Sequence, residues 1–461
     1  MKSFLGRKAE LQKLSSEYNR ESSFIVMYGR CRVGKTTLIK EFIKDKKALY
    51  FLSTSELEIK NRNRFITSVA EFTGMPYLKN SNFDNWYDIF EIIVNYQPEE
   101  KKIIVIDEFQ YLANANPSFT SIFQRIWDDI LKDKNIMVIL CGSYISMMTT
   151  QVLHYSSPLY GRRTCQMKLK PLKFTEIKEG FSNLSFNELV SLYTVTGGVP
   201  KYLEFFDNNL GFFENIKNEI LDKNGFLYEE PTFLLQKEVR ETMTYFSIIQ
   251  TIADNNHKLS KIASALEVPA TKLTPYIKTL MDLSLVEKRV PVTEKNPSKS
   301  KKGLYYIEDN FIEFWLRFVY PYKSELEMEN TQYVLDKIKN NLIDNHVSFV
   351  YEDICREQFV NQSSDLGFII SKIGSYWDSK VEIDIVAIDN DNKKLIVGEC
   401  KYLNKPMKDS VFYNLIEKAD SIKGYDDYDK VYVLFSLNGF EDRIININKT
   451  RNDLILFDNN K

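Results

Sequence analysis

The sequence predicts an α/β protein in which a doubly wound parallel sheet is followed by smaller helical and mixed domains. Over the first 170 residues, short β-branched runs alternate with helical patterns. These runs are continuously apolar, which is typical of parallel strands that helices cover on both faces. The chain of 461 residues is also too long for a single hydrophobic core.

Five apolar runs are the expected strands of this first sheet, which we place in a domain at residues 1–170. They span 24–28, 48–52, 103–106, 137–141 and 165–169. After Pro171 the pattern becomes helical and rich in aromatic residues, as at 186–193 and 202–206. We therefore predict a helical lid at 171–240.

Residues 241–312 have the pattern of a winged helix. Two short helices, at 260–266 and 271–283, flank the turn Glu267-Val268-Pro269. A strand at 285–290 then leads through a loop rich in lysine, serine and proline to a second strand at 304–307. We expect a helical connector at 313–345. The last domain, 346–461, has the order helix, strand, strand, helix, strand, helix, strand.

Composition limits the class of protein. The formal net charge is −2, so no overall field attracts nucleic acid, and DNA contact would need a local basic patch. The five cysteines and three histidines are scattered without a CxxC pair, which argues against zinc and disulfides and suits a reducing cytosol. No apolar run approaches the roughly 18 residues of a membrane span. We expect a cytoplasmic protein without a signal peptide or membrane contact.

A phosphate-binding loop is the strongest motif. Gly29-Arg30-Cys31-Arg32-Val33-Gly34-Lys35-Thr36 matches G-x-x-x-x-G-K-[ST], follows the strand 24–28 and opens a helix that begins at Thr37. Backbone N–H groups of such a loop and the N-terminus of its helix surround the phosphates of ATP. Lys35 adds a positive charge, and the Thr36 hydroxyl is a ligand for Mg²⁺. The sequence thus predicts that residues 29–37 bind Mg·ATP.

Two carboxylates end the strand at 103–106. Asp107 is the expected acid of the Mg²⁺ shell, and Glu108 is the expected base that orients and deprotonates the attacking water. Ser143 follows the next strand, where it either reaches the γ-phosphate or caps a helix. Arg162 and Arg163 either neutralise γ-phosphate charge as an arginine finger does or form a surface pair. Their action in trans would require a homo-oligomer, whereas action in cis allows a monomer.

These motifs together resemble the archaeal-type AAA+/STAND P-loop ATPases. The resemblance covers about the first 310 residues and adds an opening signature, Phe4-x-Gly6-Arg7-x-x-Glu10-Leu11, and the segments 158–163 and 196–203. It implies a nucleotide-driven switch whose lid and winged helix report the nucleotide state. It also implies that Pro200, in a Gly-x-Pro lid element, packs near the adenine.

The C-terminal domain resembles the domain of uncharacterised function that accompanies some of these ATPases, and also the PD-(D/E)xK nucleases. Asp384 lies on one alternating strand, and Glu399 and Lys401 share a face of the next. A hairpin would bring the two carboxylates together to hold Mg²⁺ or Mn²⁺, with Lys401 stabilising charge. Glu352, on a helix at 348–359, is a further expected acid. The resemblance implies a restriction-endonuclease-like fold, although Glu382-Ile383 stands where a proline is nominal.

Basic residues gather in the predicted winged helix. Lys295, Lys299, Lys301 and Lys302 occupy its loop, which predicts either phosphate contacts with DNA or a solvated flexible loop. Arg289 lies nearby, and Lys272 and Lys278 lie on the second short helix. The leading interpretation is an ATPase that controls a metal-dependent DNA nuclease. The alternative is a STAND-type regulatory switch whose later domains only bind nucleic acid or protein.

Overall fold

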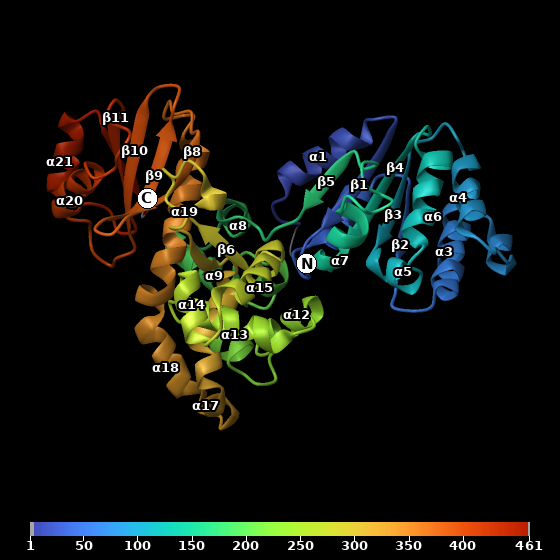
Figure 1. Cartoon of the computed structure of the whole chain (residues 1–461), viewed down its shortest axis with the longest axis horizontal. Coiled ribbons are helices and arrows are strands. Elements are labelled where there is room, and N and C mark those ends of the chain that lie inside the picture. The colour runs from blue at the N-terminus through green and yellow to red at the C-terminus, as the bar shows by residue number, and fades with distance from the viewer. Residues whose placement is uncertain (1–3, 460–461) are drawn as a thin grey trace. The chain divides into compact units, whose positions relative to one another are not determined.

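The computed structural model describes residues 4–459, which form two compact units with the elements labelled in Figure 1. The first unit comprises the described residues up to Leu172 together with Val199–Lys201 and Gln236–Arg240. The second unit comprises the other described residues. The region predicted as a lid, 171–240, is therefore divided between the units, since two short passages of it pack with the first. No helix among residues 4–459 is long and apolar enough to cross a membrane.

The first unit contains the predicted parallel sheet. Its order is β2-β3-β4-β1-β5, and every pair is parallel. The strands are β1 Ser22–Tyr28, β2 Ala48–Leu52, β3 Lys102–Asp107, β4 Ile136–Gly142 and β5 Cys165–Lys168. All residues of β3 and β4 are buried. Burial on both faces explains why these strands show no polar alternation in the sequence.

Helices cover both faces of this sheet. On one face, Ile25 and Met27 of β1 pack in a core with Leu38 and Ile39 of α2. On the other face, Phe24 contacts Phe123 of α6, with ring centroids 5.9 Å apart. The helices of this unit are α1 Lys8–Tyr18, α2 Lys35–Ile43, α3 Glu58–Thr73, α4 Trp86–Asn95, α5 Gln110–Ala115, α6 Phe119–Ile126 and α7 Ile145–Met148. The doubly wound architecture was thus predicted correctly.

The helical part that follows begins in the second unit. Its helix α9 starts at a capping box, in which the Ser185 hydroxyl accepts from the Glu188 N–H and the Glu188 carboxylate accepts from the Ser185 N–H. Gly197 ends the same helix with φ 58°, a conformation that glycine adopts without strain. The helices here are α8 Phe174–Gly180, α9 Phe186–Thr196, α10 Pro200–Leu203, α11 Phe212–Asn215 and α12 Glu230–Glu238.

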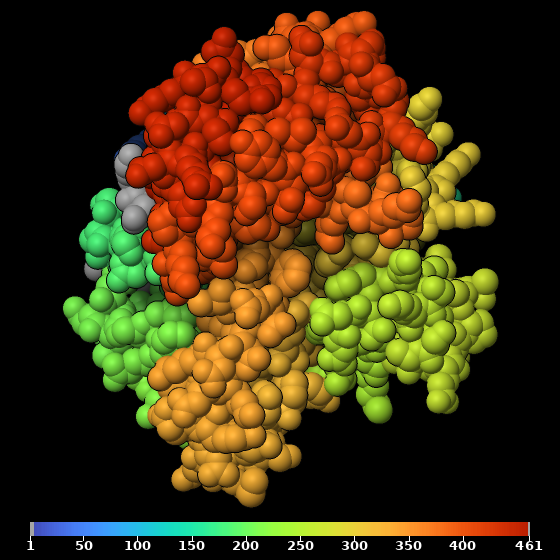
Figure 2. Space-filling model, turned by 90° about the vertical axis from the view of Figure 1, so that its left-hand side faces the viewer, coloured from blue at the N-terminus to red at the C-terminus, as the bar shows by residue number. Residues whose placement is uncertain are grey.

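Three helices and a hairpin form the next part, with the two short helices and the second strand within one residue of their expected bounds. The helices are α13 Thr242–Ala253, α14 Leu259–Ala265 and α15 Ala270–Asp282, and the antiparallel strands are β6 Val286–Arg289 and β7 Leu304–Ile307. The loop between the strands, in yellow, projects at the edge of the face shown in Figure 2. The predicted boundary at 312/313 lies within a continuous helix, α16. The helices that follow are α16 Asn310–Phe318, α17 Lys323–Glu327, α18 Thr331–Leu342 and α19 Ser348–Gln362.

The C-terminal part is a mixed sheet in the order β12-β11-β10-β9-β8. Its strands are β8 Lys372–Trp377, β9 Glu382–Asp389, β10 Lys394–Lys401, β11 Asp429–Ser436 and β12 Leu454–Asp458, and its helices are α20 Asp409–Ala419 and α21 Asp442–Thr450. Strand β9 runs antiparallel to both of its neighbours, β8 and β10, and β10, β11 and β12 are parallel. The sequence interpretation missed β8, because this edge strand is bulged at Gly374/Tyr376 and has only one buried residue.

Candidate functional site

The phosphate loop lies between β1 and α2, as predicted. Gly29 cannot be replaced without strain, because a Cβ there would lie 2.3 Å from the carbonyl oxygen of Leu169. Gly34 has φ 89° and is the N-cap of α2, so the backbone N–H groups of the first turn of that helix, which have no partner within the helix, lie at the end of the loop. Lys35 Nζ donates to the carbonyls of Gly29 and Arg30, each at 2.8 Å. The predicted residues form the loop and the start of α2: Gly29, Arg30, Cys31, Arg32, Val33, Gly34, Lys35, Thr36 and Thr37.

A buried arginine braces this loop from outside. Arg7, only 4% exposed, donates to the carbonyl of Val33 at 2.8 Å and to that of Lys170 at 2.6 Å. Its other terminal nitrogen contacts Glu10 at 3.0 Å. The opening signature quoted from the sequence thus has a physical role: it fixes the phosphate loop against the end of β5.

Thr36 and Asp107, the residues predicted to hold Mg²⁺, meet at the carboxyl ends of the strands. Thr36 Oγ1 donates to Asp107 Oδ2 at 2.7 Å, and the Tyr50 hydroxyl donates to the same oxygen at 2.7 Å. Burial, together with the charge of Asp107, raises the pKa of Tyr50. A hydroxyl and a buried carboxylate side by side suit Mg²⁺, which prefers oxygen ligands. Tyr50 was not predicted, because nothing local in β2 distinguishes it from a packing aromatic residue.

Glu108 and Ser143 also lie together, after β3 and β4. The Ser143 hydroxyl donates to Glu108 Oε1 at 2.6 Å, and its backbone N–H donates to Oε2 at 3.3 Å. The side-chain amide of Gln110 donates to the same carboxylate. Glu108 has φ 54°, an uncommon conformation for a residue with a side chain. The three donors hold this carboxylate in one orientation, and the helix-cap alternative for Ser143 receives no support, since α7 begins without a side-chain cap.

Arg162 and Arg163 lie at the other edge of the sheet. The parallel register pairs Cys165 with Ile25 and Lys168 with Tyr28, so the residues before Cys165 lie where the strands begin. Three strand residues span about 10 Å, which separates these arginines from the loop after Tyr28. The Arg162 guanidinium contacts Asp128 at 2.8 Å and holds the pKa of that carboxyl below its usual value. This placement does not support action on the same subunit's phosphate and leaves action in trans open.

Two short passages from later in the chain complete the surroundings of the loop. Pro200 lies beside it, since a Cβ at Gly34 would be 3.6 Å from Pro200 Cγ. Lys237 Nζ lies 2.9 Å from Cys31 Sγ and 4.8 Å from the centroid of the Tyr144 ring. Sequence reasoning identified Pro200 by resemblance but missed Lys237, because no local pattern indicates where the end of α12 docks.

A second group of predicted residues gathers in the C-terminal sheet. β9 and β10 pair antiparallel as far as Ile385 and Gly398, so Asp384 and Glu399 come next on adjacent strands. The Cys400 N–H donates to Asp384 Oδ2 at 2.9 Å. Glu399 is 6% exposed, and its carboxylate contacts Lys401 at 2.9 Å. Lys418 Nζ, on α20, lies 3.0 Å from the same carboxylate; this residue was not predicted.

Burial makes the carboxyls of Asp384 and Glu352 reluctant to ionise. Burial and the charge of Glu399 raise the pKa of Asp384 to about 6. Burial and the charge of Asp384 raise the pKa of Glu352, on α19, well above its usual value. Although burial opposes charge on Lys401, Glu399 raises the pKa of that lysine. The predicted set Glu352, Asp384, Glu399 and Lys401 therefore shares one partly buried site.

The side chains of this second site fit the requirements of a divalent cation only in part. Adjacent carboxyls with raised pKa values gain most from a cation that neutralises them. However, lysines already hold Glu399, and among residues 4–459 no three His, Cys, Asp or Glu side chains are grouped as ligands of a metal ion. A metal would have to displace the lysine contacts.

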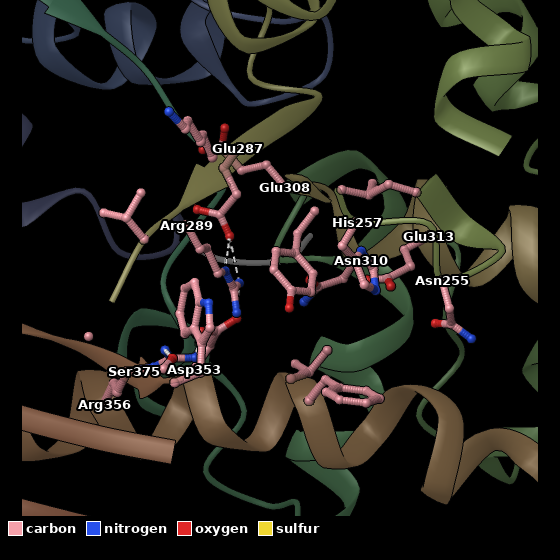
Figure 3. A pocket seen from close by; sticks show the side chains of 18 of the residues that line it. Asn255, His257, Glu287, Arg289, Glu308, Asn310, Glu313, Asp353, Arg356 and Ser375 are labelled. Carbon is pink, nitrogen blue, oxygen red and sulfur yellow. Dashed lines mark hydrogen bonds and ion pairs between the residues drawn. The ribbon is translucent and has the colours of Figure 1, made fainter. Parts of the chain in front are cut away.

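The basic residues of the three-helix part have different surroundings. Lys272, Lys278, Lys295, Lys299 and Lys301 are exposed. Lys302 is also exposed but pairs with Glu294 at 2.8 Å. Arg289 instead points into a cavity of about 510 Å³, where it pairs with Glu287 and Asp353 (Figure 3). Arg289 is thus engaged within the protein, whereas the loop lysines are exposed.

Comparison with known proteins agrees with this geometry. Residues 4–206 match the family described as "ATPase domain predominantly from Archaea", and residues 315–411 match "Archaea bacterial proteins of unknown function". The chain is also similar to the Walker-type ATPase PABY2304 of Pyrococcus abyssi, with 21% identity, a TM-score of 0.51 and coverage of 68% of this chain and 96% of that chain. This last likeness concerns the fold alone.

Two relatives come from Methanocaldococcus jannaschii. The uncharacterized ATP-binding protein MJ0423 is 49% identical over 45 residues, which are 10% of this chain and 76% of that protein. The uncharacterized protein MJECL04 is 36% identical over 437 residues, which are 94% of this chain and 95% of that protein. The chain therefore belongs to the family of MJECL04, and it combines an archaeal-type P-loop ATPase domain with a C-terminal domain of the second family.

Proposed function

We propose that the first unit binds and hydrolyses Mg·ATP. The observation that carries this proposal is the meeting of the phosphate loop with two differently placed carboxylates. Asp107 contacts the Thr36 hydroxyl at 2.7 Å, and Glu108 is held by Ser143 at 2.6 Å. The Asp107 carboxylate therefore lies beside the hydroxyl of the loop residue Thr36, whereas the Glu108 carboxylate is held separately by Ser143.

Each residue then has a distinct task. The loop N–H groups and Lys35 hold the phosphates, which requires Lys35 to leave the carbonyls that it contacts in this structure. Thr36 and Asp107 would hold Mg²⁺, which when bound neutralises phosphate charge. Glu108 orients a water molecule and accepts its proton. Ser143, as a hydrogen-bond donor, keeps that carboxylate in place.

Phosphate release by the purified chain tests this proposal. Lys35→Ala should abolish ATP binding, and Glu108→Gln should retain ATP but lose turnover at least tenfold, because it removes only the base. Lys44→Ala, an exposed change at the end of the same helix, is the matched control and should match the wild type. ATP hydrolysis that persists in Lys35→Ala would refute the proposal.

We further propose that the C-terminal part is a metal-dependent DNA nuclease. Support comes from the shared site of Asp384, Glu399 and Lys401, with Glu352 as a further acid. In this proposal Asp384 and Glu399 would hold Mg²⁺ or Mn²⁺, which when bound would supply polarisation of a phosphodiester, and Lys401 would stabilise the developing charge. The exposed lysines of the loop between β6 and β7 would hold the DNA backbone.

The alternative is a regulatory ATPase switch that uses this part only for binding. Supercoiled, linear and single-stranded DNA would be incubated with Mg²⁺ or Mn²⁺, with and without ATP. A nuclease loses cleavage in both Asp384→Ala and Lys401→Ala, whereas Asp391→Ala, in the exposed turn between β9 and β10, should cut normally. Absence of cleavage with ATP turnover intact would favour the switch. The contacts of Lys401 and Lys418 with Glu399 would explain such an absence, because they occupy a carboxylate that a metal ion would need.

A further inference from the structure

A lysine from a distant part of the chain lies beside the phosphate loop. Lys237 lies about two hundred residues after the loop, in the passage Gln236–Arg240 that packs with the first unit. Its ammonium group is 2.9 Å from Cys31 Sγ and lies 4.8 Å from the Tyr144 ring centroid. The side chain as a whole is exposed, so a ligand can reach it.

Electrostatics keep Lys237 charged in this position. Burial of the ammonium opposes its charge, but the Cys31 thiol, Tyr144 and Glu108 raise the pKa of Lys237 above its usual value. The ammonium lies 4.8 Å from the centroid of the Tyr144 ring, which places it on the side of the proposed base, Glu108. Tyr144 directly follows Ser143, which holds that base.

The neighbouring residue lies in the same passage. Burial raises the pKa of Glu238 to about 7, although the backbone N–H of Ile145, at the start of α7, and the charges of Lys237, Lys35 and Arg30 act in the opposite direction. Lys237, one residue earlier, thus belongs to a passage, Gln236–Arg240, that packs with the first unit.

The position of a third phosphate follows from the same geometry. The loop and the first turn of α2 hold the inner phosphates, with Thr36 and Asp107 at the metal side. In the proposed function the outermost phosphate then lies between that metal side and the water molecule that Glu108 would orient. Lys237 is beside Cys31 and on the Glu108 side, so its ammonium borders this position.

We propose that Lys237 binds the γ-phosphate of ATP in cis and stabilises the charge that develops there during hydrolysis, an inference that rests on the ATPase function proposed above. The residue forms no covalent bond and transfers no proton. It supplies a positive charge to the phosphate oxygens, the task for which Arg162 and Arg163 lie at the wrong edge of their own subunit. ADP, which lacks the third phosphate, should be insensitive to Lys237.

The test compares ATP and ADP on the full chain in the presence of Mg²⁺. Lys237→Ala should weaken ATP binding at least tenfold, change ADP binding less than threefold and lower turnover at least tenfold. Lys237→Arg should restore most of the preference for ATP, because a guanidinium also reaches phosphate oxygens. Arg240→Ala, an exposed cation in the same passage, is the matched control and should behave as the wild type.

The outcomes separate the two proposals. If the wild type neither binds nor hydrolyses ATP, the ATPase function fails and the role of Lys237 fails with it. If the wild type hydrolyses ATP but Lys237→Ala weakens ATP and ADP binding equally, or weakens neither, the ATPase function is supported and the γ-phosphate contact is refuted. Equal loss in Arg240→Ala would likewise refute it, because the effect would then reflect general charge.

Discussion

Replacement of Glu238 by glutamine should stabilise the first unit, and by more at alkaline pH. Oε2 of this carboxyl is buried and accepts no hydrogen bond from any residue between 4 and 459. Burial raises its pKa from 4.5 to about 7, although the Ile145 N–H and the charges of Lys237, Lys35 and Arg30 act in the opposite direction. The folded chain therefore binds this proton more tightly than the unfolded chain does.

The sign and magnitude follow from proton linkage. Because the folded pKa is the higher one, stability falls as pH rises from about 4.5 to about 7, and the full penalty remains above that range. The wild type then carries a penalty of about 1.4 kcal/mol at pH ~5.5 and about 3 kcal/mol at pH ~8.5. Since Glu238 is only part-buried, screening reduces both values by up to about half. Glu238→Gln should thus gain roughly 1–2 kcal/mol more at the higher pH.

Hydrogen exchange of the β1 and β4 amides measures this difference in the first unit itself. Wild type and variant would be compared at the same pH, so that intrinsic exchange rates cancel. Glu99→Gln, an exposed change in the same unit, is the control and should show no pH-dependent gain. An equal effect of Glu238→Gln at both pH values, or a loss of protection at pH ~8.5, would refute the linkage argument.

Three further predictions concern the frame around the loop. Arg7→Ala should lower the stability of the first unit by about 3 kcal/mol in hydrogen exchange, because a buried and a part-buried carbonyl lose a charged donor. A loss below ~1 kcal/mol would contradict the role of Arg7 as a brace of the loop. Gly29→Ala should prevent ATP binding in calorimetry, since its Cβ would lie 2.3 Å from the Leu169 carbonyl oxygen, and retained affinity would show that β5 can move. Arg162→Ala should cost less than about 1 kcal/mol in thermal unfolding, because its pair with Asp128 is part-exposed. The same variant should bind ATP normally as a monomer, and a loss there would contradict its place at the far edge.

Local patterns were sufficient to predict the first sheet and most of its site. Continuous apolar runs indicated β1, β3 and β4, and polar residues directly after them had to lie at one edge because the strands are parallel. Asp107, Glu108 and Ser143 meet there. The same logic of strand alternation brought Asp384 beside Glu399 across a hairpin.

Features that depend on distant packing were not predictable in this way. Lys237 and Glu238 belong to a helix whose pattern gives no indication of the phosphate loop. The motif of Arg162 left open whether this residue reaches the phosphate, and only the register of β5 shows that it lies at the opposite edge. Strand β8 lacked a signal, because an edge strand with one buried residue has no apolar run to detect.

The two short passages of chain that return to the first unit limit how this protein can be dissected. A fragment that ends at residue 172 would contain the whole sheet and the phosphate loop, yet it would lack Pro200 and Lys237. A fragment cut at residue 206, where the family match ends, would still lack Lys237 and Glu238. An expressed ATPase core therefore needs the chain through Arg240. Weak ATPase activity in a shorter fragment would therefore reflect the choice of boundary and not the properties of the native site.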